Sequence, residues 1–202
     1  MDDDRPKSLK DPGQIALRVA ALSNPDMKPL ADFVKTLRQH GYGEVPNFDP
    51  EDGGVKAKAL FLLEKPGEKA IKSGFVSRDN NDETAANIFR FMKKAGIPRK
   101  KTCLWNAVPG RNGPGKPTDT EIRQGAVALA DLLRILDKVR VVVLVGNEAG
   151  NAWRRLAENQ RSLPIIKSAH PSPITRGYNR DLWEEIPTQW AKVKPFLCQN
   201  SN

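Results

Sequence analysis

The sequence has few cysteines, no long apolar run and no sign of an export signal. Its two cysteines, Cys103 and Cys198, are too few for a disulfide framework or a four-thiolate metal centre, so we expect no metal or cofactor. No apolar stretch approaches the ~20 residues that a membrane-spanning helix needs. The first residues are polar and acidic, unlike a secretory signal. These absences predict a cytoplasmic protein with no membrane partner.

Positive charge is concentrated in one part of the chain. The net charge is +9, and residues 64–180 contain 22 Lys and Arg against 11 Asp and Glu, whereas the remaining residues contain 11 against 13. Such a basic segment suits a polyanion, because contacts to phosphates supply most of the affinity for nucleic acid. A solvated basic surface is the alternative, and charge alone does not separate the two.

The beginning of the chain is predicted to be helical and distinct from an α/β body. We expect a frayed tail of about ten residues, helices over residues 14–22 and 29–40, and a loop over residues 43–55 that is rich in Gly, Pro and Asp. Residues 1–57 are thus expected to pack as a tail and helices on one α/β domain formed by residues 58–202.

Strand and helix patterns alternate through this body. Apolar runs predict strands over residues 58–63, 102–107, 139–145 and 164–167, and helical spacing predicts helices over residues 82–95, 118–136, 147–158 and 180–193. The run VRVVVLV is typical of a central strand buried on both faces. Thr118 and Glu121 form a capping box. The alternation predicts an α/β fold: a three-layer αβα sandwich with a parallel four-stranded central sheet.

Four short segments mark the ends of the predicted strands. They are LEKPG, WNAVPG, LVG and AHPSP, at residues 63–67, 105–110, 144–146 and 169–173. Ligands of open parallel sheets bind outside the carboxyl ends of the strands. We therefore expect Glu64, Asn106 and His170 to converge on one pocket, which favours an enzyme.

Each candidate residue also has a purely structural interpretation. Two prolines after His170 stiffen its loop, yet a lone histidine is more often structural, as we expect for His40 at a helix end. Asn106 either presents a donor and an acceptor to a nucleobase or forms a turn. Glu64 either orients water and faces a developing cation or anchors its loop. Phe75 either stacks on a base or belongs to the core.

Together and in this order, the segments resemble the two motifs of the uracil-DNA glycosylase superfamily, over about residues 59–176. HPSP agrees letter for letter with the second motif. LEKPG is similar to the G-E-A-P-G form of the first motif in the thermophilic branch. Glu64, Pro66 and Gly67 match that form, whereas Leu63 and Lys65 depart from it.

The resemblance implies hydrolysis of the N-glycosidic bond of a uracil nucleotide flipped out of single- or double-stranded DNA, by a monomer without a cofactor. It implies that His170 donates a hydrogen bond to the uracil O2 and that Glu64 orients water or stabilises the sugar cation. The implied base-binding residues are Asn106, Phe75, Pro66 and Gly67. The implied DNA contacts are Lys65, Arg111, Ser172, Ile174, Thr175 and Arg176, with Ile174 and Thr175 as the wedge that replaces the flipped base.

Departures from the family pattern leave alternatives open. Another branch has a water-activating aspartate where this chain has Lys65, and a lysine there would pair with Glu64 or bind a phosphate. That branch also has a thymine-excluding tyrosine where this chain has Gly67. The thermophilic branch holds an iron–sulfur cluster on four cysteines, so two cysteines imply a cluster-free relative. The alternatives are a glycosylase for thymine, hypoxanthine or xanthine, and a non-catalytic DNA-binding relative. A generic nucleotide-binding protein is disfavoured, because no G-x-G-x-x-G or P-loop follows the first strand.

Overall fold

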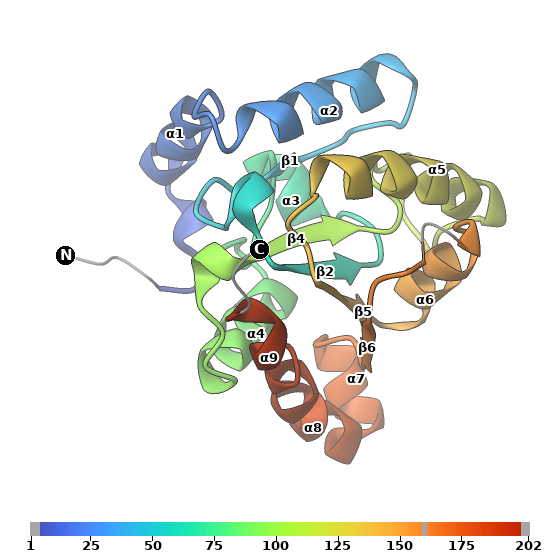
Figure 1. Ribbon diagram of the computed structural model, residues 1–202. Coiled ribbons are helices and arrows are strands. Elements are labelled where there is room, and N and C mark those ends of the chain that lie inside the picture. Colours follow the sequence, from blue (N-terminus) through green and yellow to red (C-terminus); the bar gives the residue numbers. More distant parts are fainter. Residues whose placement is uncertain (1–4, 159–160, 199–202) are drawn as a thin grey trace.

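A computed structural model describes residues 5–158 and 161–198, and at its centre lies a four-stranded sheet (Figure 1). The strands lie in the order β4 (Thr102–Asn106), β2 (Ala59–Leu63), β5 (Val141–Val145) and β6 (Ile165–Ser168). All neighbouring pairs are parallel. The predicted parallel four-stranded sheet is therefore confirmed, with strand bounds within about two residues of those expected.

The register of the sheet brings the carboxyl ends of its strands to one edge. Leu63 at the end of β2 lies opposite Asn106 at the end of β4, and Val145 at the end of β5 lies opposite Ser168 at the end of β6. All five residues of β5 are buried, because helices cover both faces of this central strand. Loops that leave these ends start close together in space.

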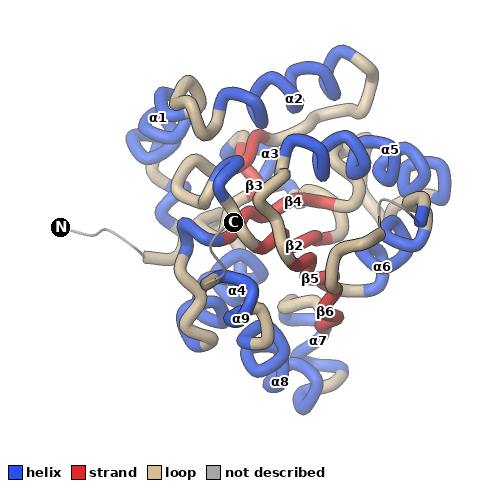
Figure 2. Tube along the Cα trace, viewed as in Figure 1, coloured by secondary structure: helices blue, strands red, loops and turns tan. Residues whose placement is uncertain are grey.

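Helices form a layer on each side of the sheet, as predicted for an αβα sandwich (Figures 1 and 2). One layer contains α2 (Lys28–Gln39), α5 (Asp119–Ile135) and α6 (Asn147–Arg154), and the other contains α4 (Glu83–Lys94), α8 (Arg180–Ala191) and α9 (Lys194–Leu197). The capping box at the start of α5 is confirmed: the Thr118 hydroxyl accepts from the Glu121 amide, and the Glu121 carboxylate accepts from the Thr118 amide. No helix in the described ranges is long and apolar enough to cross a bilayer.

The N-terminal part of the chain is more ordered than its sequence suggests. A 3-10 turn η1 (Ser8–Lys10) and helix α1 (Pro12–Ala21) precede α2, so the expected frayed tail is wrong for residues 8–10. The expected loop over residues 43–55 contains strand β1 (Asn47–Phe48), which pairs in parallel with β3 (Phe75–Val76). Phe48 stacks on Trp105 of β4 with ring centroids 4.0 Å apart. This contact joins the small second sheet to the core.

Four short helical segments and one helix end also differ from expectation. The turns η2 (Gly54–Lys56) and η3 (Arg99–Lys101) flank the first two strands of the main sheet, and α3 (Glu68–Ser73) and α7 (Pro173–Tyr178) follow the two motif loops. Helices this short carry too few apolar positions for a periodic signal. Helix α6 ends at Arg154 rather than near residue 158.

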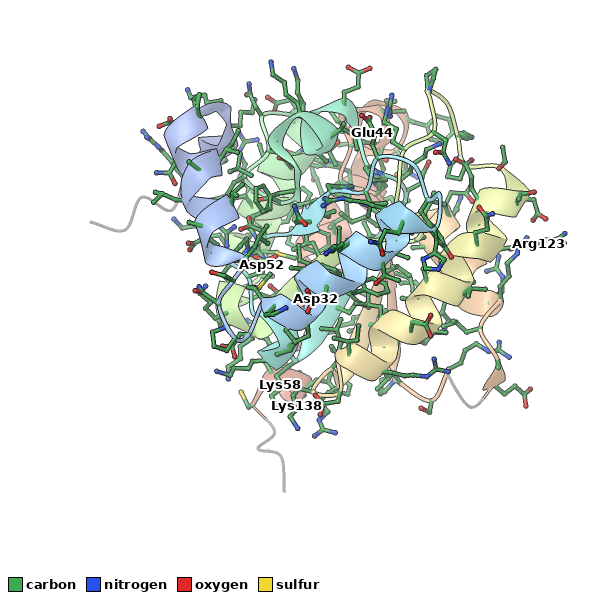
Figure 3. The ribbon with its side chains drawn as sticks, turned by 90° about the horizontal axis from the view of Figure 1, so that it is seen from above. Asp32, Glu44, Asp52, Lys58, Arg123 and Lys138 are labelled. Atoms are coloured by element: carbon green, nitrogen blue, oxygen red, sulfur yellow. The ribbon has the colours of Figure 1, made fainter. Side chains whose placement is uncertain are left out.

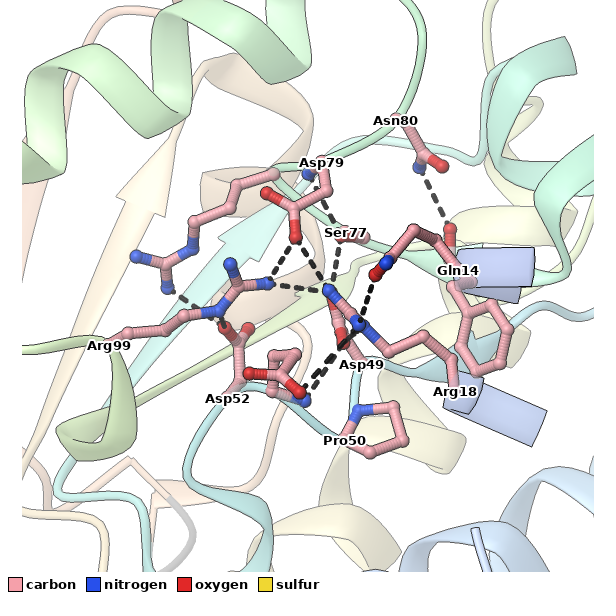
Figure 4. Close-up of polar contacts among 12 residues, drawn as sticks. Gln14, Arg18, Asp49, Pro50, Asp52, Ser77, Asp79, Asn80 and Arg99 are labelled. Atoms are coloured by element: carbon pink, nitrogen blue, oxygen red, sulfur yellow. Dashed lines mark hydrogen bonds and ion pairs between the residues drawn. The ribbon is translucent and has the colours of Figure 1, made fainter. Parts of the chain in front are cut away.

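A buried ionic cluster holds α1 against the body (Figure 4). Arg18 of α1 donates from Nε to Asp49 at 2.9 Å and from Nη2 to Asp79 at 3.0 Å. Asp49 also accepts a short hydrogen bond from the Ser77 hydroxyl. We call this set the arginine–aspartate cluster; its members are Arg18, Arg78, Arg99, Asp49, Asp52 and Asp79. The loop after β3 is thereby fixed from its buried side.

Burial and the arginine charges act in opposite directions on the carboxyl groups of this cluster. Burial would raise the pKa of Asp49, but Arg99, Arg18 and the Ser77 hydroxyl hold that pKa below its ordinary value. For Asp52, burial raises the pKa to about 6, because the neighbouring Asp49 and Asp79 offset part of the attraction of Arg78 and Arg99. One carboxyl of the cluster therefore titrates well above the usual aspartate range.

Candidate active site

A cleft of about 440 Å³ lies at the carboxyl edge of the sheet. Its lining includes Glu64, Asn106 and His170, which follow or end three different strands. The structure thus brings the three central candidate residues together in one cavity. Among the described residues, none of the three side chains has an ion pair or a hydrogen-bond partner, so all three polar groups are available to a ligand.

Asn106 is the most constrained of the three. It ends β4, is 3% exposed, and is followed by Ala107, whose amide donates to the Leu63 carbonyl at 2.8 Å. A buried carboxamide is nearly always hydrogen-bonded, and leaving one unpaired is costly. An amide that reaches the cleft without a protein partner is therefore suited to a ligand that offers both a donor and an acceptor.

Glu64 leaves β2 toward the same cleft. Its backbone carbonyl accepts from the Val108 amide at 2.9 Å, which ties the loop after β2 to the loop after β4. The side chain is partly buried. Burial raises the pKa of the Glu64 carboxyl and Glu148 adds to this, whereas Lys116 and Lys65 oppose it. A carboxylate with a raised pKa accepts a proton more readily, which suits a group that activates water.

His170 is held by contacts on two sides. Gly146 has φ +85°, a conformation that disfavours other residues, and a Cβ placed there would lie 3.4 Å from the His170 Cβ. On the other side, the Asn87 side chain donates to the Pro171 carbonyl at 3.0 Å. Burial lowers the pKa of the His170 imidazole below 6.5. The ring is therefore neutral near pH 7 and keeps one N–H to donate.

Lys65 forms no ion pair with Glu64, and its side chain does not lie on an open surface. Its ammonium pairs with the Glu121 carboxylate at 2.9 Å, and the two side chains are 8% and 14% exposed. The position of Lys65 therefore does not support the expected phosphate contact, because its ammonium is already paired with Glu121 inside the protein. Glu121 is the capping-box residue of α5, so one carboxylate serves both the helix start and the loop after β2.

Pro66 and Gly67 line the cleft as expected, and Arg111 supports them. The Arg111 guanidinium donates to the Pro66 carbonyl at 3.3 Å and lies 3.6 Å from the Glu68 carboxylate. Arg111 therefore holds the loop of the first motif, besides any contact to DNA. No atom lies within 4 Å of a Cβ built on Gly67, so the cleft has free space at this position.

Phe75 is not brought into the cleft. Its side chain is 0% exposed, and the cleft is lined by the next two residues, Val76 and Ser77. Successive side chains of a strand point to opposite faces, so Phe75 and Val76 of β3 cannot both face the cavity. The expected stacking of Phe75 on a base is not supported by this position. The apolar surface of the cleft comes instead from residues such as Val76, Pro66 and Ile88.

The residues after His170 form α7 rather than part of the cleft lining. Ser172 caps this helix by accepting from the Thr175 amide at 3.2 Å, and the two hydroxyls lie 3.1 Å apart. The Arg176 guanidinium lies over the Trp183 ring, 5.2 Å from its centroid. Ile174 is 83% exposed and stands out from the surface. Its exposure leaves the side chain free for a contact outside the protein, and the wedge role stays a prediction.

Two positioning residues were missed at the level of sequence. Asn80 donates to the Phe75 carbonyl at 2.9 Å and accepts from Ser73 at 2.6 Å, and it lines the cleft. Asn87 fixes the Pro171 carbonyl from within α4. The polar run SRDNND after the predicted stacking residue hinted at the first, but no local signal marks the second. No group of three or more metal-ligating side chains occurs within residues 5–158 and 161–198.

A parallel sheet with helices on both faces and a polar cleft across its strand ends is the arrangement of an α/β enzyme. A model of the uracil DNA glycosylase superfamily matches residues 50–194, which is most of the chain. The chain belongs to this superfamily of DNA glycosylases. Its match to a solved structure of a mimivirus UNG variant in complex with UGI has 17% identity and a TM-score of 0.40, over 81% of this chain and 70% of that chain. No curated relative matches the chain.

Proposed function

We propose that this protein is a uracil-DNA glycosylase that removes uracil flipped out of DNA and leaves an abasic site. The observation that carries the proposal is the convergence of Glu64, Asn106 and His170 on one 440 Å³ cleft. The three side chains have no partners among the described residues. Hydrolysis of a glycosidic bond needs a base-reading group, a stabiliser of the departing base and a group that handles water, and these three residues supply all of them.

The chemistry follows from the charges that develop. The bond between the sugar C1′ and the uracil N1 breaks, and its electron pair leaves with the base. His170, neutral because burial lowers its pKa, donates an N–H to the uracil O2, where negative charge collects. A water oxygen bonds to C1′, and Glu64, whose pKa is raised by burial, takes the proton that the water loses.

Base recognition is assigned to Asn106 and the apolar cleft wall. The Asn106 carboxamide presents a donor and an acceptor, which match the O4 and N3–H of uracil. Pro66 and Val76 line the same cleft and would cover the faces of the base in place of Phe75. Outside the cleft, Ile174 on α7 would fill the gap in the base stack.

The test is cleavage of labelled DNA that contains one uracil, single- and double-stranded, followed by alkali to break abasic sites. We expect strand breaks at uracil that are lost in Asn106→Ala and His170→Ala. His40→Ala is the matched control, because His40 is exposed at the end of α2 and its Nδ1 contacts the Thr36 carbonyl. A folded protein that binds uracil DNA without breaking it would exclude this function.

A broader base specificity is the second candidate, and the free space at Gly67 favours it. A cleft without a side chain at this position has room for a 5-methyl group. A panel of duplexes with uracil, mismatched thymine, hypoxanthine or xanthine separates the two. Excision of uracil alone supports the first proposal, and comparable excision of thymine supports the second.

A further inference from the structure

A second cleft lies beside the first and is lined by lysines from two distant parts of the chain. It has a volume of about 260 Å³, with Leu9, Pro12 and Ile15 on the N-terminal side and α3 on the other. Lys10, Lys69 and Lys72 all line it. We call these three residues the lysine triad. No aspartate or glutamate lines this cleft.

The charges of the lysine triad are not neutralised within the described part of the chain. All three side chains are exposed, and none makes an ion pair or hydrogen bond with another described residue. The contrast is Lys7, which pairs with Glu83 although it lies only three residues from Lys10. Three ammonium groups around one hollow without a carboxylate form a site for an anion with several oxygens.

The lysine triad is held on a fixed surface. The Leu9 amide donates to the Asp79 carbonyl at 3.0 Å, and the Leu9 side chain is 4% exposed, so η1 is docked on the loop after β3. Lys69 and Lys72 are three residues apart on α3 and share one face of that helix. Arg18 of the arginine–aspartate cluster reinforces the same docking by pairing with Asp79.

The second cleft neighbours the active site. Lys69 lines both cavities, and α3 starts directly after Gly67, which lies in the loop of the first motif. A DNA strand whose base enters the first cleft must pass its neighbouring phosphates over the mouth of that cleft. Lys69 lines the first cleft, and the second cleft that it shares with Lys10 and Lys72 offers a place for such phosphates.

We propose that the lysine triad binds backbone phosphates of the DNA strand that flanks the flipped nucleotide. The inference rests on the proposed action on DNA and extends it, because Lys10 lies outside the region that matches the superfamily, residues 50–194. The N-terminal segment is then part of the DNA-binding face and not only a support for the fold. The contact is to phosphate, so it adds affinity without reading sequence.

The test is the salt dependence of DNA binding by the full chain. The variant is Lys10→Gln/Lys72→Gln, which leaves Lys69 in place because Lys69 also lines the active site. The matched control is Lys101→Gln/Lys138→Gln, which removes the same charge from exposed lysines that precede β4 and β5. Lys138 lies with Lys58 at one end of the molecule, away from Glu44 (Figure 3). The backbone of Glu44 forms an antiparallel bridge with that of Arg111, which lines the first cleft.

Fluorescence anisotropy with uracil-free and uracil-containing duplexes between roughly 50 and 200 mM salt gives the slope of log affinity against log salt. Loss of two phosphate contacts should reduce that slope by about 1.8 in the double variant, with little change in the control. At saturating DNA, kcat should stay within about twofold of the parent. Equal slopes in the variant and the control would overturn the proposal, even if inorganic phosphate binds the second cleft.

The binding assay also separates this inference from the proposed function. A reduced slope in a protein that never excises uracil would support the phosphate site and exclude the uracil-DNA glycosylase activity. Excision of uracil with an unchanged slope would support the activity and exclude the phosphate site. Shortening the duplex on one side of the uracil adds a second readout. Removing the side that reaches the lysine triad should weaken DNA binding by the parent and should leave DNA binding by the variant nearly unchanged.

Discussion

The Asn87 side chain donates a 3.0 Å hydrogen bond to the backbone carbonyl of Pro171. Asn87 lies in α4, and Pro171 follows the histidine that faces the cleft, 84 positions later in the sequence. Helix α4 thus fixes the loop that carries His170, the proposed hydrogen-bond donor to the departing base. Asn87 is 7% exposed, so water cannot readily replace it.

Replacing Asn87 should impair catalysis more than folding. We expect Asn87→Ala to lose about 1 kcal/mol of stability, the usual net worth of one hydrogen bond, and about tenfold or more in kcat, because a displaced imidazole no longer meets the base. Single-turnover excision and urea unfolding measure the two effects. Arg90→Ala is the control, since Arg90 contacts the Asn87 carboxamide oxygen at 3.1 Å but not the loop. Equal losses in both variants would contradict this role.

Gly146 should tolerate no side chain. It has φ +85° and ψ 177°, a conformation that costs other residues about 1–3 kcal/mol, and an added Cβ would lie 3.4 Å from that of His170. We expect Gly146→Ala to lower both the melting temperature and the activity. Gly150→Ala in α6 is the matched substitution and should stabilise the protein by about 0.5–1 kcal/mol, because Gly is a poor helix former. Loss of stability in both Gly146→Ala and Gly150→Ala would indicate that α6 tolerates no added methyl group, and would contradict a specific role for the Gly146 conformation.

Gly67→Tyr should narrow base selectivity without unfolding the protein. The backbone at Gly67 has φ −77°, which any residue adopts, and no atom lies within 4 Å of the new Cβ. A ring at this position would occupy the free space that a 5-methyl group needs. The ratio of uracil to thymine excision should rise in Gly67→Tyr and stay near the parent value in Gly67→Ala. A falling ratio would show that the tyrosine blocks uracil as well.

The dependence of activity on pH should reflect the protonation of both Glu64 and His170. Acid removes the active form of both groups, because the Glu64 carboxylate gains a proton and the His170 imidazole becomes charged. The raised pKa of Glu64 moves its protonation toward neutral pH, whereas the lowered pKa of His170 keeps the imidazole neutral to a more acidic pH. We expect kcat/KM to rise with pH and to level off near neutrality. In Glu64→Gln, activity should fall by about 10² or more, and the remaining acidic limb should lie below pH 6.5. Activity that increases toward acid pH would contradict the assignment.

Asp52 should give the stability of the protein an unusual dependence on pH. Its folded-state pKa of about 6 exceeds its ordinary value of 3.8, so the stability it contributes is present below pH 3.8 and is lost as pH rises through 6. Urea unfolding between about pH 4 and pH 7 should show this component, on the order of 2–3 kcal/mol, and Asp52→Asn should remove it. Asp32→Asn, at an exposed pair with Lys28, should leave the profile unchanged.

Much of the central fold is readable from the sequence because its signals are local. The β-branched run of β5 and the Thr118–Glu121 capping box each lie within a few residues, and both have the structure that their patterns predict. Parallel strands then place the polar residues at their ends on one edge, and for that reason the meeting of Glu64 with Asn106 could be anticipated.

The rest depends on contacts between distant residues. Arg18 pairs with Asp79, 61 positions away in the sequence, and Lys65 pairs with Glu121, 56 positions away. No pattern in a single sequence predicts either pair. The orientation of Phe75 could not be predicted either, although it depends on neighbouring residues. A two-residue strand has no periodicity from which to tell its two faces, so the sequence does not reveal that Val76 rather than Phe75 borders the cleft.

The double use of Glu121 couples a helix end to the active site. Its carboxylate accepts from the Thr118 amide at the start of α5 and from the Lys65 ammonium beside Glu64. If the first turn of α5 opens, Lys65 loses its partner, and its positive charge, which already opposes the raised pKa of Glu64, is no longer offset by Glu121. The proton affinity of the Glu64 carboxylate would then fall further. Amide exchange at the start of α5 and turnover at the cleft should then vary together, as two readouts of one local opening.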